Sequence, residues 1–241
     1  MSVLNIAAYK FVTLDDLLER RVELLARCEA LALKGTILLA TEGINLFLAG
    51  SESGINGFKA MLHNDPAFAD IAYKDSWSEQ QPFGKMLVKL KQEIIPLGIS
   101  EVNPATNPAP RLTPQQLKAW LDAGRDVLLL DTRNGFEVDH GTFANAKHLS
   151  INNFRHLPQA LQQIDENAKQ KPVVTFCTGG IRCEKAAPYL LQQGFQEVYQ
   201  LDGGILKYFE ECGNAHFNGE CFVFDERVAL DAELNPARDV G

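Results

Sequence analysis

The chain has 241 residues, of which 46% are hydrophobic and 22% are charged. This length and composition are typical of a globular protein of one or two domains with a sizeable buried core. The formal net charge of −8 excludes non-specific attraction to polyanions over the whole surface, but it still allows a local basic face.

No signal for a membrane or for secretion is present. The sequence has no run of about eighteen apolar residues, and its start lacks a basic segment followed by an apolar stretch. The five cysteines do not resemble a secreted disulfide framework; they stand at positions 28, 177, 183, 212 and 221. We therefore expect a cytoplasmic protein whose cysteines are thiols.

The first hundred residues alternate strand and helix patterns. Extended segments are expected at residues 3–9, 35–40, 44–49, 71–77 and 86–95. Apolar residues recur at helical spacing from Leu14 to Leu31, and a second helix is expected to begin near Ser51. The order βαββαβ predicts a ferredoxin-like domain over residues 1–98, with one further strand appended.

The pattern changes after a proline-rich stretch at residues 99–111, which predicts a linker. A helix is expected over 112–123, with Thr113 as its N-cap and Pro114 at its first position. Buried strands follow at residues 127–130, 172–176 and 198–201. Apolar strands alternating with helices predict an α/β domain with a mainly parallel sheet over 112–215, and an extended C-terminal segment over 216–241.

Cys177 directly follows the apolar segment 172–176. In open α/β sheets the reactive site lies beyond the carboxyl ends of the strands. Gly179 and Gly180 let the backbone curl back, so that several N–H groups can point at one sulfur. With Arg182 nearby, the loop favours a thiolate or persulfide anion; the alternative is an inert buried cysteine beside a tight turn.

Several motifs resemble those of rhodanese domains. The segment from Cys177 to Cys183 resembles the rhodanese active-site loop, and its inner residues are Thr178, Gly179, Gly180, Ile181 and Arg182. The sequences DTR at 131–133, EVDHGTFANA at 137–146 and LDGGI at 201–205 resemble other rhodanese segments. One departure is Thr142, which stands where many rhodaneses have histidine.

The motifs as a set are closer to a single family. CTGGIRCEKA, DTRN, the early GTILLATEGIN and the late GECFVFDERV run from residue 35 to residue 228, and together they resemble the tRNA uridine hydroxylases. The resemblance implies a rhodanese-like catalytic domain at 112–215 and conversion of the wobble uridine, in the tRNA anticodon loop, to 5-hydroxyuridine. It also implies molecular oxygen as co-substrate and Cys177 as the essential residue.

Two residues of the loop have both a functional and a structural interpretation. Arg182 stabilises the Cys177 anion or contacts a phosphate; alternatively it is a solvated arginine at the start of a helix. Cys183 forms a disulfide with Cys177 during redox chemistry, or it is a small buried thiol in the first turn of the helix. Both interpretations stay open for each residue.

Charged residues near the loop have the same ambiguity. Arg133 and Asp131 support the site, with Arg133 pointing into it, or Arg133 forms an ion pair with Asp131 or Glu137. For Glu184 and Lys185, which fall on the helix after the loop, we expect ion pairs at the surface.

No metal site or bound cofactor is predicted. Cys212, His216 and Cys221 have irregular spacing and lack a fourth ligand, which disfavours zinc. The sequence also has neither a facial-triad spacing nor a dinucleotide-binding glycine motif. Oxygen chemistry usually depends on such a group, so the sequence does not explain how oxygen is activated.

Candidate RNA contacts lie in the first domain. Four lysines are expected to cluster around Trp77 and Phe83; they are Lys74, Lys85, Lys89 and Lys91. Cations for phosphates beside aromatic rings for base stacking suit an RNA-binding surface. The alternative is a solvated face of a strand.

Two other functions are compatible with parts of the sequence. A sulfurtransferase carrying a persulfide on Cys177 would need the same loop but not the first domain. A non-catalytic module binding RNA or protein would not need an intact nucleophile loop. The motifs together favour the tRNA-modifying enzyme, and no oligomeric state is predicted.

Overall fold

The computed structural model describes residues 2–225 and 227–236, so part of the predicted C-terminal segment lies outside the described residues. The chain divides into two compact units, Met1–Pro96 and Leu97–Gly241. Within the described part of the chain, no helix has both the length and the apolar character that a membrane span requires.

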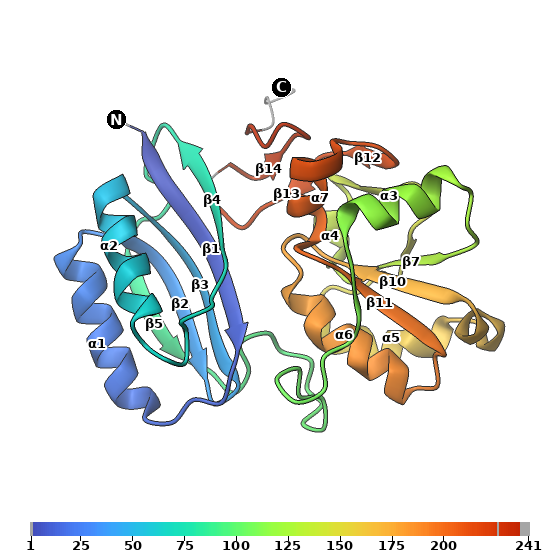
Figure 1. Ribbon diagram of the computed structural model, residues 1–241, viewed down its shortest axis with the longest axis horizontal. Helices are drawn as coiled ribbons and strands as arrows, with labels where there is room; N and C mark the ends of the chain where they lie inside the picture. The colour runs from blue at the N-terminus through green and yellow to red at the C-terminus, as the bar shows by residue number, and fades with distance from the viewer. Residues whose placement is uncertain (1, 226, 237–241) are drawn as a thin grey trace. The chain divides into compact units, whose positions relative to one another are not determined.

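The first unit is a five-stranded sheet with two helices (Figure 1). Its elements in chain order are β1 (Val3–Phe11), α1 (Leu17–Ala30), β2 (Lys34–Ala40), β3 (Gly43–Gly50), α2 (Glu52–His63), β4 (Tyr73–Ser78) and β5 (Met86–Leu90). The strand order is β4-β1-β3-β2-β5, with β5 parallel to β2 and the other pairs antiparallel. The predicted ferredoxin-like arrangement with one appended strand is confirmed.

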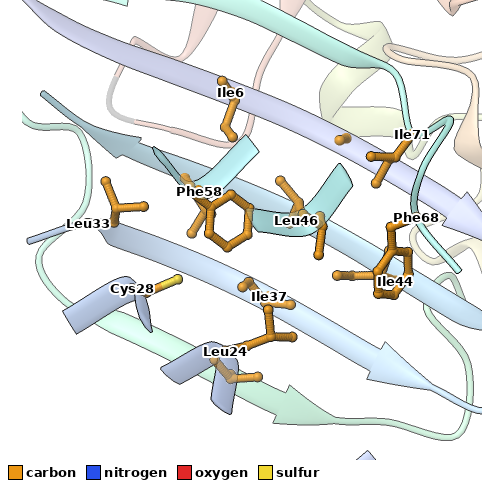
Figure 2. Close-up of a cluster of buried hydrophobic side chains, with 14 of the residues drawn as sticks. Ile6, Leu24, Cys28, Leu33, Ile37, Ile44, Leu46, Phe58, Phe68 and Ile71 are labelled. Carbon is orange, nitrogen blue, oxygen red and sulfur yellow. The ribbon is translucent and has the colours of Figure 1, made fainter. Parts of the chain in front are cut away.

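The core of this unit lies between the helices and one face of the sheet (Figure 2). Alternate strand residues such as Ile37 and Leu46 point toward Phe58 of α2, because successive side chains of a strand face opposite sides. Cys28 of α1 is part of this core, and burial raises the pKa of its thiol to about 12. Cys28 is therefore a structural residue.

The segment predicted as a strand over 86–95 is shorter than expected, since β5 ends at Leu90. The chain then follows the turn between β2 and β3. The Ile94 N–H donates to Glu42 Oε1 at 2.7 Å, and Asn45 Nδ2 donates to the Ile94 carbonyl at 3.3 Å. The early motif around Glu42 and Asn45 thus anchors the end of this unit.

The second unit has a five-stranded sheet in which every strand pair is parallel. Its strand order is β6-β11-β10-β7-β9. These strands are β6 (Arg111–Leu112), β7 (Leu128–Asp131), β9 (Lys147–His148), β10 (Pro172–Phe176) and β11 (Glu197–Leu201). The predicted parallel α/β architecture is confirmed, and residues 97–110 belong to this unit, with Val102 and Ala109 buried.

Helices cover both faces of this sheet, with α3 and α7 on one face and α5 and α6 on the other (Figure 1). They are α3 (Pro114–Asp122), α4 (Gly135–Val138), α5 (Leu157–Ala160), α6 (Ile181–Gln192), α7 (Gly204–Cys212) and the short 3-10 helices η1 (Phe154–His156), η2 (Leu161–Gln163) and η3 (Glu166–Gln170). The start of α3 is as predicted: Thr113 Oγ1 accepts from the Gln116 N–H at 3.2 Å, and Pro114 occupies the first turn.

The C-terminal segment adds short strands to the second unit. Strand β12 (Phe217–Gly219) pairs with β8 (Gly141–Phe143), and β13 (Cys221–Phe222) pairs with β14 (Ala229–Leu230). Cys221 lies in the same buried core as Phe143. The extended segment is therefore built into the domain that carries Cys177.

Candidate active site

Cys177 lies at the carboxyl end of β10, the middle strand of the parallel sheet. Only 2% of its surface is exposed. The loop that begins at Cys177 ends at Gly180, which caps α6 in a left-handed conformation with φ of 98°. This φ is costly for a residue with a Cβ, so glycine suits the position.

The loop backbone is turned toward the sulfur. The Gly180 N–H donates to Cys177 Sγ at 3.1 Å. On the other side, the N–H groups of Ile205 and Leu206 donate to the carbonyls of Cys177 and Thr178 at 2.9 and 3.1 Å. The start of α7, where the late LDGGI motif ends, thus binds two carbonyls of the loop.

The environment of Cys177 lowers the pKa of its thiol to about 7. Burial by itself raises this pKa, but four groups act in the opposite direction. They are the Cys183 thiol, the Arg182 guanidinium and the backbone N–H groups of Arg182 and Gly180. Donors and a cation around a buried sulfur stabilise its anion, so this environment favours the thiolate form of Cys177.

Cys183 is fully buried and free of any disulfide. Burial and the neighbouring Cys177 raise the pKa of its thiol well above the ordinary value, and its Sγ lies 3.8 Å from Thr132 Oγ1. A thiol that keeps its proton can donate to the Cys177 thiolate. The structure therefore shows the predicted small buried thiol, and a disulfide during turnover stays a prediction.

Arg182 is only 7% exposed, so its interpretation as a solvated arginine is wrong. Its guanidinium forms a bidentate salt bridge with Glu137: Nη1 lies 3.0 Å from Oε1, and Nη2 lies 2.8 Å from Oε2. Glu137 is fully buried, and its Oε2 also accepts from the Asn134 N–H at 3.1 Å. This buried carboxylate draws the guanidinium inward, toward the sulfur.

Arg133 is fully buried and forms the predicted ion pair with Asp131, with Nη2 2.7 Å from Oδ2. Its Nη2 also donates to the Gly141 carbonyl at 2.6 Å. Thr142, the departure from the usual histidine, donates through Oγ1 to Asp131 Oδ2 at 2.8 Å. These contacts occupy the Arg133 guanidinium, so this pair acts as a support beneath the loop.

The comparisons with known proteins follow the same division of the chain. A family model described as the UPF0176 acylphosphatase like domain matches residues 3–94, and the rhodanese-like domain model matches residues 113–211. The tRNA uridine(34) hydroxylase of Cupriavidus taiwanensis is 54% identical over 242 residues, which cover 98% of this chain and 86% of that protein. The chain belongs to the tRNA uridine(34) hydroxylase family.

The chain is also similar to other known proteins. The tRNA uridine(34) hydroxylase of Bordetella petrii is 54% identical, and the match covers 98% of this chain and 96% of that protein. Among solved structures, a rhodanese-like domain protein from Staphylococcus aureus is 26% identical over 41% of this chain and 90% of its own, with a TM-score of 0.36. The family resemblance and the two-domain fold class expected from the motifs are confirmed.

The expectation that Glu184 and Lys185 form ion pairs at the surface is wrong. Both side chains are buried, because the first turns of α6 pack inside the domain. Glu184 Oε2 accepts from Gln200 Nε2 at 3.0 Å, and its Oε1 pairs with Arg111 at 2.6 Å. A polar cluster joining α6 to the sheet takes the place of surface pairs.

The predicted lysine cluster is also wrong. Lys74 lies on β4, whereas Lys89 lies on β5, at the opposite edge of the first sheet; Lys85 and Lys91 flank β5. Four strand spacings separate the two edges, about 19 Å. Strands from earlier in the chain insert between β4 and β5, so closeness in sequence does not give closeness in space. Only the β5 lysines form a local group.

Cys212, His216 and Cys221 do not form a ligand set. His216 Nε2 lies 2.7 Å from Asp122 Oδ1, whereas Cys221 is buried near the Cys177 loop. Burial raises the pKa of the Cys221 thiol to about 12. Within the described ranges, no three histidine, cysteine or acidic side chains are placed to hold a metal ion.

Two parts of the site had only weak signals in the sequence. Glu137, which positions Arg182, lies in a motif that resembles a rhodanese segment. Nothing in the sequence indicated that its side chain is buried. Phe136, Phe222 and Phe224 come from two separate segments and pack against one another, and their only signal is that each lies inside or beside a family motif.

Proposed function

We propose that this chain hydroxylates uridine 34 of tRNA, the wobble base of the anticodon loop, with molecular oxygen as co-substrate and Cys177 as the reacting residue. The observation that carries the role of Cys177 is its buried sulfur, whose pKa of about 7 results from donors that surround it. Membership of the tRNA uridine(34) hydroxylase family supports the substrate and the reaction. We place this activity in the cytoplasm, where free thiols persist.

The chemistry that suits a thiolate is addition to the uracil ring. The sulfur electron pair forms a bond to C6, and the C5–C6 π electrons move onto C5 and the O4 enolate. C5 then becomes nucleophilic and bonds to O2, which gives a C5 hydroperoxide after protonation. Two thiols from solution reduce the O–O bond, are oxidised to a disulfide and release water, so that one hydroxyl oxygen stays on C5. After oxygen is bound to C5, loss of the C5 proton and cleavage of the C6–S bond restore the double bond and release the thiolate.

The target base must leave its stack to reach a sulfur that is 2% exposed. Extrusion of a base from a single-stranded loop is less costly than extrusion from a duplex, which suits an anticodon loop as the substrate. Lys85, Lys89 and Lys91 are candidate phosphate contacts for that tRNA, because they share one sheet edge. Lys74 is a candidate only for a second contact at the opposite edge.

The cysteine role is tested by complementation. A deletion strain is expected to lack 5-hydroxyuridine derivatives in digested tRNA, and wild type but not Cys177→Ser is expected to restore them. Restoration by Cys177→Ser would remove the cysteine from the mechanism. Reaction of purified protein under isotopically heavy oxygen gas is expected to place one heavy atom in the nucleoside, and label coming from water instead would contradict oxygen dependence.

The lysines are tested by the salt dependence of tRNA binding. Each lost phosphate contact is expected to reduce the slope of log K against log salt by roughly one unit. The triple change Lys85→Gln, Lys89→Gln, Lys91→Gln therefore flattens this slope more than Lys74→Gln does. Equal slopes for the wild type and the triple variant would exclude these contacts.

A sulfurtransferase would use the same loop, because the donors that stabilise a thiolate also stabilise a persulfide. The two functions separate in one assay. With thiosulfate and cyanide as substrates, we expect the Cys177-dependent rate of thiocyanate formation to be far below the rate of tRNA hydroxylation. A thiocyanate rate far above the hydroxylation rate would favour sulfur transfer.

A further inference from the structure

Three phenylalanine rings from two distant segments gather beside the Cys177 loop. Phe136 belongs to α4, Phe222 belongs to β13, and Phe224 follows it. Their ring centroids are 5.3 Å apart for Phe136 and Phe222, 5.1 Å for Phe222 and Phe224, and 6.4 Å for Phe136 and Phe224. All three contacts are edge-to-face, the geometry that aromatic pairs favour.

The outer rings of this phenylalanine cluster are exposed although phenylalanine is usually buried. Phe136 is 47% exposed and Phe224 is 51% exposed. Single exposed apolar side chains are ordinary, but a contiguous exposed aromatic group marks a surface that contacts something else. Packing within the domain does not account for these two rings.

The phenylalanine cluster is attached to the reactive loop at several points. Thr178 Oγ1 donates to the Phe222 carbonyl at 3.4 Å. The Arg182 guanidinium carbon lies 5.7 Å from the centroid of the Phe224 ring. Phe136 directly precedes Glu137, the carboxylate that holds Arg182. The cluster therefore lies at the rim of the site and shares the residues that activate Cys177.

The chemistry of this rim suits a nucleobase. Flat exposed rings stack on any base because every base has a π face. The cluster contacts Thr178 and Arg182 beside Cys177, so a uracil that reaches the buried sulfur from this side passes the rim. An exposed ring at the entrance is then placed to stack the base next to it in the chain of the tRNA.

We propose that the Phe136–Phe222–Phe224 cluster stacks a base of the anticodon loop adjacent to the reacting uridine and so positions that uridine at Cys177. This inference rests on the proposed function for the identity of the RNA. Phe224 is the principal contact, since it is the most exposed ring of the three and lies against Arg182.

Binding to an anticodon stem-loop RNA tests the stacking without requiring turnover. The full-length protein is titrated under nitrogen, and the dissociation constant is measured by fluorescence anisotropy of labelled RNA. Phe224→Leu keeps apolar bulk but removes the π face, and it is expected to weaken binding roughly tenfold. Phe224→Trp, which enlarges the face, is expected to bind more tightly than Phe224→Leu.

A matched control uses Leu191, which is 37% exposed and lies ten residues along α6 from Ile181, about 15 Å from the loop end of the helix. Leu191→Ala is expected to leave RNA binding unchanged. The pH profile of Cys177 alkylation is recorded for each variant. If the pH profile of Phe224→Leu equals that of the wild type, Phe224 does not hold Arg182 in place. A loss of RNA binding in that variant is then due to lost stacking.

A double-mutant cycle identifies the stacked base. Abasic nucleotides are placed one at a time in the loop, and each RNA is bound to wild type and to Phe224→Leu. At one position beside the reacting uridine, the abasic change is expected to weaken wild-type binding about tenfold but to weaken the variant much less. Additive losses at every position, or equal binding by wild type and Phe224→Leu, would overturn the proposal.

These outcomes are distinct from failure of the proposed function. Absence of 5-hydroxyuridine from the reaction of the wild-type protein would remove the hydroxylase activity, while coupling in the binding cycle would still place the base on Phe224. Normal hydroxylation with a wild-type KM in Phe224→Leu would keep the function and remove the stacking role.

Discussion

Cys177 and Arg182 lie on one loop, and the guanidinium stays near the sulfur because Glu137, from a different segment, binds it. Without that carboxylate, burial of the arginine charge would be costly. At the scale of single residues, the acidity of Cys177 therefore depends on a residue that is not part of its loop.

The first prediction concerns the pH dependence of Cys177. Its thiol has a pKa of about 7, so the rate of alkylation by iodoacetamide is expected to be half-maximal near pH 7 and to fall below it as the thiolate is protonated. Arg182→Gln removes a cation that lowers this pKa, so the midpoint is expected to move upward. Mass spectrometry of the Cys177 peptide measures the rate.

Arg125→Gln is the control for that shift, because Arg125 pairs with Glu197 at the surface. The Cys177 midpoint in this variant should equal that of the wild type. A midpoint that stays near pH 7 in Arg182→Gln would show that the backbone donors and Cys183 alone set the acidity.

The second prediction concerns the stability of the buried ion pair. Glu137→Gln leaves the Arg182 charge buried without its counter-ion, so the free energy of unfolding is expected to fall by about 3 kcal/mol. Urea denaturation measures the change. Lys171→Gln, which breaks an exposed ion pair with Asp126, is expected to cause no measurable change. Similar losses in both variants would contradict the buried role of Glu137.

At the scale of elements, the start of α7 shapes the reactive loop. Gly204 has a φ of +65°, and a Cβ there would lie 2.4 Å from the Cys177 carbonyl oxygen and 2.7 Å from that of Thr178. Gly204 therefore permits the close approach of α7 to the loop. The LDGGI motif, which comes after the loop in sequence, completes the loop in space.

The third prediction follows from this contact. Gly204→Ala is expected to displace the loop, so the Cys177 alkylation midpoint moves upward and the melting temperature falls. Gly124→Ala is the matched control: its φ is +64°, but a Cβ there meets no atom within 4 Å. That control should cost only about 1–2 kcal/mol of backbone strain, with an unchanged Cys177 midpoint. A normal midpoint in Gly204→Ala would refute the role of α7.

Element predictions from the sequence succeeded where the pattern is local. The helical spacing from Leu14 to Leu31 predicted α1, yet Leu18 and Val22 on that helix are exposed. Spacing indicates which residues share a helix, but the width of the buried face depends on what packs against it. Helix α1 begins after Asp16, whose side chain makes no capping bond.

At the scale of the whole molecule, every group found to tune Cys177 belongs to the second unit. The fourth prediction follows: a fragment spanning 97–241 is expected to fold and to keep a Cys177 alkylation midpoint near pH 7. The fragment is also expected to lose tRNA hydroxylation, because the candidate lysine contacts lie in the first unit. Circular dichroism, alkylation and analysis of tRNA nucleosides measure the three properties.

Either of two results would contradict this prediction. A fragment whose Cys177 titrates like an ordinary thiol would mean that the first unit contributes to the acidity. A fragment that hydroxylates tRNA as fast as the full chain would mean that the first unit is not needed for the substrate.

The main helices and strands, the position of Cys177 after a buried strand and the family could be predicted from the sequence. These features depend on local periodicity and on motifs that are contiguous in the chain. Only the tertiary structure decided that Arg182 and Glu137 form a buried pair, that the lysines lie on opposite edges and that Phe136 meets Phe224. Burial, pKa and contacts between distant segments depend on chain topology, which local spacing does not encode.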